Sequence, residues 1–241
     1  MSNGPQIHGS PGEGARMQGL ARAIWPLLAV LFVCGYVLGA VVRWPPFNAT
    51  TGGITLLAIA VILFVGSHFC SKRIAAFFKG ALGEERVANV LARLPADHHV
   101  FHSVSLGTTA GSASGDMDHV VVGPTGVFVI ETKNWRGRVT LDGVNMLLDG
   151  APTRRDPLAQ AKQACAALST RLANNGTAGV PLTAVVCFAS ESLTPDCAQA
   201  GDVIVCNASR LLDALADAEK HSQMRINVDR VVAVLAPVES K

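Results

Sequence analysis

The sequence has few charged residues. Only 16% of its 241 residues are Asp, Glu, Lys or Arg, against about a quarter in a typical globular protein. The deficit is concentrated, because residues 23–42 and residues 45–71 contain no charged residue at all. Two such stretches so close together argue against a chain that is soluble throughout, and they are typical of segments that cross a bilayer.

Two apolar runs, residues 23–42 and residues 54–70, predict membrane spans. At 1.5 Å per residue the first run is long enough for a hydrocarbon core of about 30 Å, and the second is at the short end. A signal peptide is the alternative for the first run, but its apolar core would be shorter and no small-x-small cleavage site follows. We therefore predict a two-helix transmembrane hairpin over residues 23–71, preceded by a flexible, Gly/Ser/Pro-rich cytoplasmic tail over residues 1–22.

Basic residues flank this predicted hairpin unevenly. They are Arg16 and Arg22 before it, Lys72, Arg73 and Lys79 after it, and Arg43 in the link. The positive-inside rule then places both ends in the cytoplasm, as in a multi-pass protein of the inner (cytoplasmic) membrane. Gly35 and Gly39 form a small-x-x-x-small pattern that would allow a homo-oligomer.

The sequence also lacks the features that are typical of several classes of binding site. Beyond residue 71 there are 17 basic and 17 acidic residues, which excludes a general basic coat for nucleic acid. The six cysteines form no CxxC pair and no Cys/His cluster with zinc spacing. Residues 107–115 lack the spacing of a phosphate-binding loop, so we expect a flexible linker. Cys187 and Cys206 lie in apolar runs, where reduced thiols and no structural disulfide are expected.

From residue 79 onward the pattern changes to that of an α/β domain. Apolar residues at helical spacing predict helices, and β-branched runs between turn signals predict strands. The predicted helices cover residues 82–94, 157–172, 209–220 and 228–235, and the predicted strands cover residues 100–106, 118–123, 127–133, 138–141, 145–148, 182–189 and 202–205. This order favours a mixed central sheet flanked by helices.

One strand pair carries three ionisable residues at its open end. Asp118 begins the first strand, Glu131 is near the end of the second, and the turn at residues 123–126 lies between them. Glu131 and Lys133 are two residues apart and so project from the same face. The sequence therefore predicts that the side chains of Asp118, Glu131 and Lys133 converge.

Such a group suits a hard divalent cation. Two close carboxylates repel, and Mg²⁺ or Mn²⁺ would take oxygen ligands from Asp118, Glu131 and the backbone carbonyl of Thr132. Water activated there could attack a phosphodiester, with Lys133 orienting the water or offsetting charge on the phosphate. The alternative is a salt-bridged strand end with no further role.

The residues around this group resemble a nuclease-related domain (NERD), a member of the restriction-endonuclease-like PD-(D/E)xK superfamily. The matching residues are Gly83-Glu84, Asp118-His119-Val120-Val121-Val122, Gly126-Val127-Phe128-Val129-Ile130, Glu131-Thr132-Lys133-Asn134, Gly137 and Asp156-Pro157-Leu158-Ala159-Gln160. The resemblance is strongest over residues 79–172 of an expected domain at residues 79–241. Met117 stands where the superfamily name has Pro.

The resemblance implies two further site residues. Glu84 would supply an acidic group from the first helix of the domain, and Gln160 would reach the site from the helix after the hairpin. For Glu84 the alternative is interaction with the helix dipole, and for Gln160 it is a solvated or capping position. His119 points to the face opposite Asp118, so we expect a core or supporting histidine more than a general base.

Basic residues gather just beyond the hairpin. Arg side chains pair with phosphate and a Trp ring can stack on a base, so the predicted nucleic-acid-binding residues are Trp135, Arg136, Arg138, Arg154 and Arg155. The alternative is a solvated loop edge. The sequence thus predicts a membrane-anchored, divalent-metal-dependent nuclease with DNA as the expected partner. The alternative is a catalytically silent nucleic-acid-binding or scaffolding module at the membrane.

Overall fold

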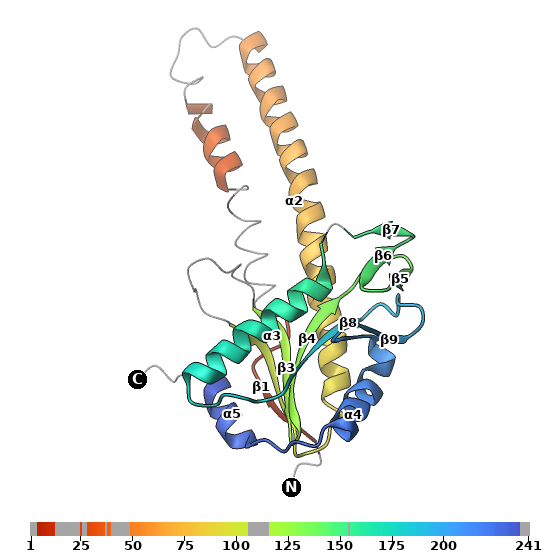
Figure 1. Cartoon of the computed structure of the whole chain (residues 1–241). Coiled ribbons are helices and arrows are strands. Elements are labelled where there is room, and N and C mark those ends of the chain that lie inside the picture. Colours follow the sequence, from red (N-terminus) through yellow and green to blue (C-terminus); the bar gives the residue numbers. More distant parts are fainter. Residues whose placement is uncertain are drawn as a thin grey trace. The chain divides into compact units, whose positions relative to one another are not determined.

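The chain divides into two units in the computed structural model (Figure 1). The structure describes residues 4–12, 25, 28–36, 38–39, 49–105, 116–153 and 155–236. One unit comprises residues 1–13 together with 80–241, and the other comprises residues 14–79.

Helix α2 (Ala49–Leu91) is a single element of 43 residues. It contains both the second predicted span and most of the helix predicted at residues 82–94, so the helix end expected near residue 71 is wrong. Lys72 and Arg73 do not interrupt it, because Lys and Arg are good helix formers and no proline stands nearby.

No membrane-spanning helix occurs in the part of the chain that the structure describes: none is both long and apolar enough to cross a bilayer. The predicted transmembrane hairpin is therefore unsupported there. Part of the first predicted span, residues 23–42, lies outside the described residues, as do the link at residues 43–48 and the predicted linker at residues 107–115.

The unit that includes residues 80–241 is built on a mixed seven-stranded sheet. Its strands are β1 (Gln6–His8), β2 (His99–Val104), β3 (Met117–Gly123), β4 (Gly126–Lys133), β8 (Leu182–Phe188), β9 (Cys197–Ala200) and β10 (Val203–Asn207). Their order is β1-β2-β3-β4-β8-β10-β9. The β1/β2, β4/β8 and β8/β10 pairs are parallel and the others antiparallel.

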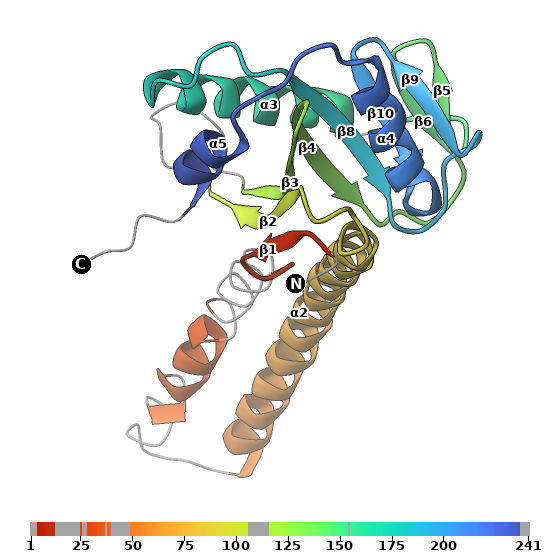
Figure 2. The same cartoon turned by 90° about the horizontal axis from the view of Figure 1, so that it is seen from below.

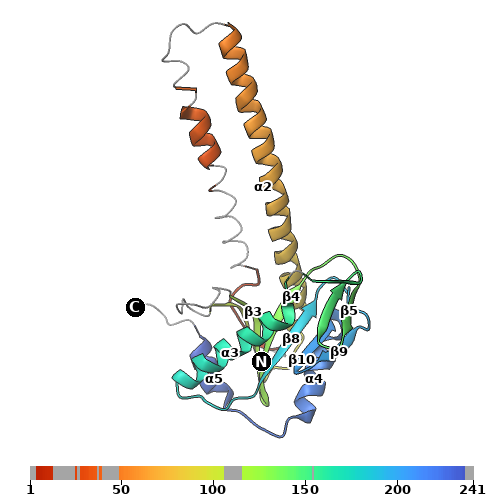
Figure 3. The same cartoon turned by 45° about the horizontal axis from the view of Figure 1, so that its top comes forward.

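A small second sheet adjoins the outer strands of the first. It consists of β5 (Val139–Asp142), β6 (Asn145–Leu148) and β7 (Ala151–Pro152). Figure 3 shows β5 beside β9, and the two sheets are joined where Val139 bridges Leu193, just before β9. The predicted mixed α/β fold is confirmed.

Helices cover both faces of the main sheet (Figure 2). On one face α3 (Pro157–Asn174) and α5 (Val228–Leu235) pack on Val127 and Val129 of β4. On the other, α4 (Leu211–His221) and the last turns of α2 pack on Phe128 and Ile130. The short 3₁₀ helix Ala208–Arg210 precedes α4. Because side chains alternate along a strand, the sequence of β4 determines which of its residues face each layer of helices.

The N-terminal segment corrects one prediction. Gln6–His8 were expected within a flexible tail, but they form β1, parallel to β2. The imidazole of His8 stacks on Phe101 with ring centroids 4.3 Å apart. Gly9 then turns the chain with φ +78°, and a Cβ there would lie 2.8 Å from the carbonyl oxygen of His102. Only glycine fits this close approach without strain.

Candidate active site

The open end of the β3–β4 hairpin brings two carboxylates opposite each other. The paired register runs from Gly123 opposite Gly126 to His119 opposite Ile130. One residue further along, Asp118 and Glu131 occupy facing positions, where the Cβ atoms of cross-strand neighbours are about 5 Å apart. Asp118 follows the same alternation as Val120, and Glu131 that of Val129, so both face the α3 side of the sheet.

Hydrogen bonds and an ion pair hold this end of the hairpin. The backbone N–H of Thr132 donates to Oδ2 of Asp118 at 2.7 Å, so the carboxylate takes the place of a partner in the strand ladder. Nζ of Lys133 lies 2.5 Å from Oε1 of Glu131, and each of these two side chains is only 15% exposed. The predicted convergence of Asp118, Glu131 and Lys133 is what the structure contains.

The carboxyl of Asp118 sits in an anionic setting. Burial raises its pKa well above the ordinary value, and the charges of Glu131 and Glu84 raise it further. The hydrogen bond from Thr132 and the charge of Lys133 act in the opposite direction. Desolvation and like charges disfavour the ionised form of a carboxyl, so added positive charge here would favour the carboxylate.

Glu84 reaches the site because α2 approaches the end of β4 closely. A Cβ on Gly83 would lie 2.8 Å from Cβ of Asn134, the residue that follows β4. Such a separation is shorter than real Cβ contacts, so only glycine permits this packing. Glu84 is 9% exposed. Its negative charge is among those that raise the pKa of the Asp118 carboxyl, and its role in the site stays a prediction.

Gln160 lies on α3, the helix that covers the face carrying Glu131 and Lys133. The helix begins as predicted, with Asp156 accepting hydrogen bonds from the N–H groups of Leu158 and Ala159 at 2.9 and 3.1 Å. Oε1 of Gln160 is buried and has no hydrogen-bond partner among the described residues. A buried amide oxygen without a partner is costly, which favours a ligand role over a solvated or capping one.

At this site only oxygen atoms are suited to bind a hard cation. No group of three or more His, Cys, Asp or Glu side chains within the described ranges could hold an ion. A cation bound here would therefore rely on Asp118 and Glu131 together with neutral oxygens, such as the Thr132 carbonyl or the Gln160 amide. The raised pKa of Asp118 between two acids and the unpaired Gln160 oxygen are consistent with such a set.

The predicted basic patch is only partly free for binding. Trp135 packs edge-on against Phe188, with ring centroids 5.5 Å apart, and extends the apolar core. Arg136, Arg138 and Arg155 are exposed, while Arg154 lies outside the described residues. The exposed guanidinium groups remain candidates for phosphate contacts, whereas part of the Trp135 ring serves packing.

His119 is fully buried, as predicted for a core histidine, but two groups of histidine contacts were not predicted from the sequence. Nδ1 of His102 lies 2.7 Å from Nδ1 of buried His119. Burial lowers the pKa of His102 to about 4, and burial with the neighbouring His102 lowers the pKa of His119 to about 3, so both rings are neutral at pH 7. The alternation of side chains along β2 and β3 is the sequence signal that could have placed the His102 and His119 rings on one face of the sheet.

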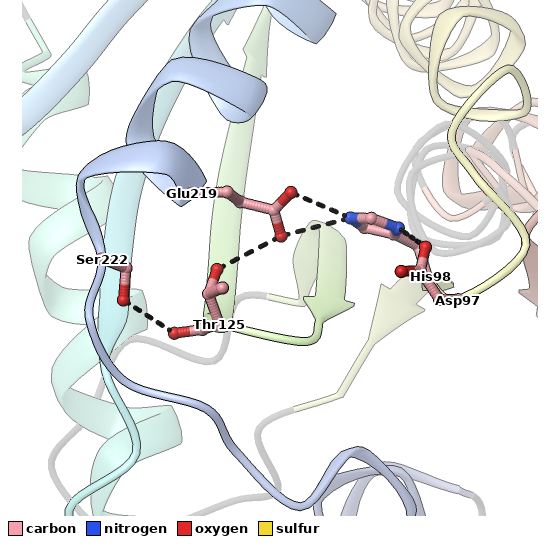
Figure 4. A network of polar contacts seen from close by, with 5 residues as sticks. All are labelled: Asp97, His98, Thr125, Glu219 and Ser222. Carbon is pink, nitrogen blue, oxygen red and sulfur yellow. Dashed lines mark hydrogen bonds and ion pairs between the residues drawn. The ribbon is translucent and has the colours of Figure 1, made fainter.

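The second group lies at the closed end of the β3–β4 hairpin (Figure 4). The carboxylate of Glu219 accepts from His98 Nε2 at 3.2 Å and from the Thr125 hydroxyl at 3.3 Å. Nδ1 of His98 lies 2.8 Å from the Asp97 carboxylate, and the Ser222 hydroxyl donates to the Thr125 carbonyl. This network ties α4 to the hairpin turn and is separate from the open end.

Residues 79–189 match the family model of the nuclease-related domain, NERD. An uncharacterized protein of Bacillus anthracis is 39% identical over 83 residues, which make up 34% of this chain and 38% of that relative. The matched part thus spans well under half of the relative. No solved structure matches the chain.

Proposed function

We propose that the nuclease-related region at residues 79–189 belongs to the PD-(D/E)xK type and hydrolyses phosphodiester bonds of nucleic acid, with DNA the expected substrate. The observation that carries this proposal is the convergence of Asp118, Glu131 and Lys133 at the open hairpin end. Together with the family match, it favours an intact hydrolytic site over a chance ion pair.

Each residue has a distinct role in this proposal. Asp118 and Glu131, with the carbonyl of Thr132, would hold Mg²⁺ or Mn²⁺. Glu84 and Gln160 would be the further polar residues of the site. When bound, the cation would lower the pKa of water and offset charge on the phosphate. Lys133 orients the attacking water through its ammonium group and stabilises negative charge on the phosphate oxygens. The Asp118–Thr132 hydrogen bond fixes the carboxylate in place.

The test is cleavage by the purified full chain of DNA and of RNA, with Mg²⁺ or Mn²⁺. Lys133→Met should reduce the rate at least about 100-fold, the size expected for loss of one electrostatic contact to developing charge. The matched control is Lys162→Met, because Lys162 forms an exposed ion pair with Asp202 away from the hairpin. Cleavage that survives Lys133→Met unchanged would overturn the proposal.

A second candidate function is binding without turnover. It is favoured by the existing Glu131–Lys133 ion pair, by the absence of a three-ligand acidic or histidine cluster in the described ranges, and by the balanced charge of the chain beyond residue 71. If the chain binds nucleic acid but leaves it intact with either cation, this reading replaces the first.

We also propose attachment to the inner membrane through residues 23–42 and 54–70, with the nuclease-related region in the cytoplasm. Support comes from the charge-free runs and from exposed apolar side chains on their described parts, among them Trp25, Phe32 and Leu57. Extraction of membranes at alkaline pH should leave the chain in the pellet and detergent should release it. Release by alkali alone would contradict the attachment. Cross-linking in the membrane would show whether Gly35 and Gly39 support a homo-oligomer.

A further inference from the structure

Three cysteines form one row across the sheet, and the row begins at the candidate site. Thr132 of β4 is in register with Cys187 of β8, Cys187 with Cys206 of β10, and Cys206 with Cys197 of β9. Register partners project to the same face of a sheet. The three thiols therefore lie side by side on the face of the sheet that carries α4. Cys187 and Cys206 are buried there, and Cys197 is outermost on the last strand of the sheet.

The pairing of Cys197 with Cys206 has the geometry that favours a disulfide. The N–H of Asn207 donates to the carbonyl of Asp196 at 2.8 Å, so these two facing residues form a hydrogen-bonded pair. Because the two pair types alternate along an antiparallel ladder, the next facing pair, Cys206 and Cys197, is not hydrogen-bonded. Its Cα atoms are then about 4.5 Å apart, within the roughly 4.4–6.8 Å that disulfides span.

The two thiols differ in access. Cys197 is exposed at the sheet edge, whereas Cys206 is fully buried beneath Leu211 and Leu215 of α4. Both are free thiols in the structure. An oxidant in solution therefore meets the Cys197 sulfur first. Cys206, the residue in register with Cys197 on the neighbouring strand, is placed to resolve the product.

We propose that Cys197 and Cys206 form a reversible disulfide when a hydroperoxide oxidises the protein. The Cys197 thiol loses its proton, and the thiolate attacks hydrogen peroxide, forming an S–O bond and breaking the O–O bond. The products are a sulfenic acid and a hydroxide ion, which takes up the released proton to give water. The Cys206 sulfur then attacks the Cys197 sulfur, losing its proton, and the hydroxyl leaves as a second water. Overall, two thiols are oxidised to one disulfide and one hydrogen peroxide is reduced to two waters.

The test maps the bond in the full chain treated with hydrogen peroxide under native conditions, then alkylated and cut before aspartate. Cleavage places Cys197 in fragment 196–201, Cys206 in fragment 202–212, and both Cys165 and Cys187 in fragment 156–195. We expect the first two fragments to be joined, and to separate after treatment with a dithiol. Burial raises the pKa of the Cys197 thiol, so the joined product should form faster at pH 9 than at pH 7.

Two variants sharpen the result. Cys197→Ser, at an exposed position, should abolish the joined fragments and leave Cys206 as a free thiol. Cys165→Ser is the control, because Cys165 lies on α3 outside the row, and it should leave the joined fragments unchanged. A bond from Cys206 to fragment 156–195, a bond between two copies of Cys197, or recovery of only sulfinic Cys197 would each overturn the proposal. Since the mapping needs no nuclease activity, its outcome is independent of the proposed function.

Discussion

The backbone N–H of Thr132 donates a 2.7 Å hydrogen bond to Oδ2 of Asp118 across the open end of the β3–β4 hairpin. This bond holds the Asp118 carboxyl at a position where burial and the charges of Glu131 and Glu84 oppose its ionisation. The hairpin thus keeps an acidic group where its charge is unfavourable unless a cation is present. Such an arrangement is typical of sites in which stability is reduced for function.

Asp118→Asn should therefore stabilise the protein while abolishing cleavage. The folded-state pKa of Asp118 is raised, so above the unfolded-state pKa the folded chain binds more protons, and its stability falls as pH rises. An amide keeps the acceptor oxygen for Thr132 and removes the charge. In a chelator at pH 7.5 we expect the Tm, measured by calorimetry, to rise by about 3–6 °C.

Divalent cation provides the control for this variant. Because a ligand that binds only the folded state stabilises it, Mg²⁺ or Mn²⁺ should raise the Tm of the wild-type chain and have little effect on Asp118→Asn. Equal cation effects on the two proteins would show that Asp118 is not a ligand. A lower Tm for the variant in chelator would show that the carboxylate is stabilising as it stands.

Gly83→Ala should destabilise the chain and reduce cleavage, although alanine is the better helix former. The added methyl would meet Cβ of Asn134 at 2.8 Å, and relief of such overpacking costs about 1–3 kcal/mol. Moving α2 outward would also carry Glu84 away from Asp118. Chemical denaturation and a cleavage assay measure the two effects.

Gly80→Ala in the same helix is the matched control. A Cβ there has no neighbour within 4 Å, so the substitution should stabilise α2 by up to about 1 kcal/mol. If both substitutions stabilise the chain equally, the close approach of α2 to Asn134 is not a constraint.

The β3–β4 hairpin could be predicted because its β-branched runs and turn at residues 123–126 are local signals, and α5 was predicted with its observed ends. β1 and β9 could not, since three- and four-residue edge strands carry no clear period. α2 was predicted as two separate helices because the charged residues after residue 71 were taken as a boundary. At the site, the two-residue spacing of Glu131 and Lys133 predicted that their side chains lie on one face of the strand. The approach of Gly83 to Asn134 joins distant segments and has no local signal.

Acid should unfold the protein through its buried histidine pair. The pKa of His102 is lowered to about 4 and that of His119 to about 3, below the ordinary value of about 6.5. Between the ordinary pKa of about 6.5 and the lowered pKa values of the two histidines, the unfolded chain binds more protons than the folded chain. The free energy of unfolding therefore falls as the pH falls below about 6.5. His119→Gln should lose about 2 kcal/mol less than wild type between pH 6.5 and pH 4.5, measured by urea titration at each pH. Parallel pH profiles for the two proteins would refute this assignment.

Glu219→Ala should weaken the closed end of the hairpin. Glu219 accepts hydrogen bonds from His98 and Thr125, and leaving the buried His98 donor without this partner costs about 1–3 kcal/mol. Asp217→Ala is the control on the same helix, because its ion pair with Lys220 is exposed and should contribute less than about 1 kcal/mol. Cleavage should be unchanged in both. If the two variants lost a similar free energy of unfolding, the network in Figure 4 would contribute no more to stability than an exposed ion pair does.

The pairing of β1 with β2 makes the sheet-bearing unit discontinuous in sequence. The chain contributes an edge strand at residues 6–8, leaves for the segment at residues 14–79, and returns for the remaining strands. A fragment that starts at residue 80 would expose the N–H and C=O groups along β2 and remove the ring stacked on Phe101. Such an edge invites pairing with another chain. Aggregation of a truncated protein would then reflect a missing strand, and supplying the N-terminal peptide in trans could restore it.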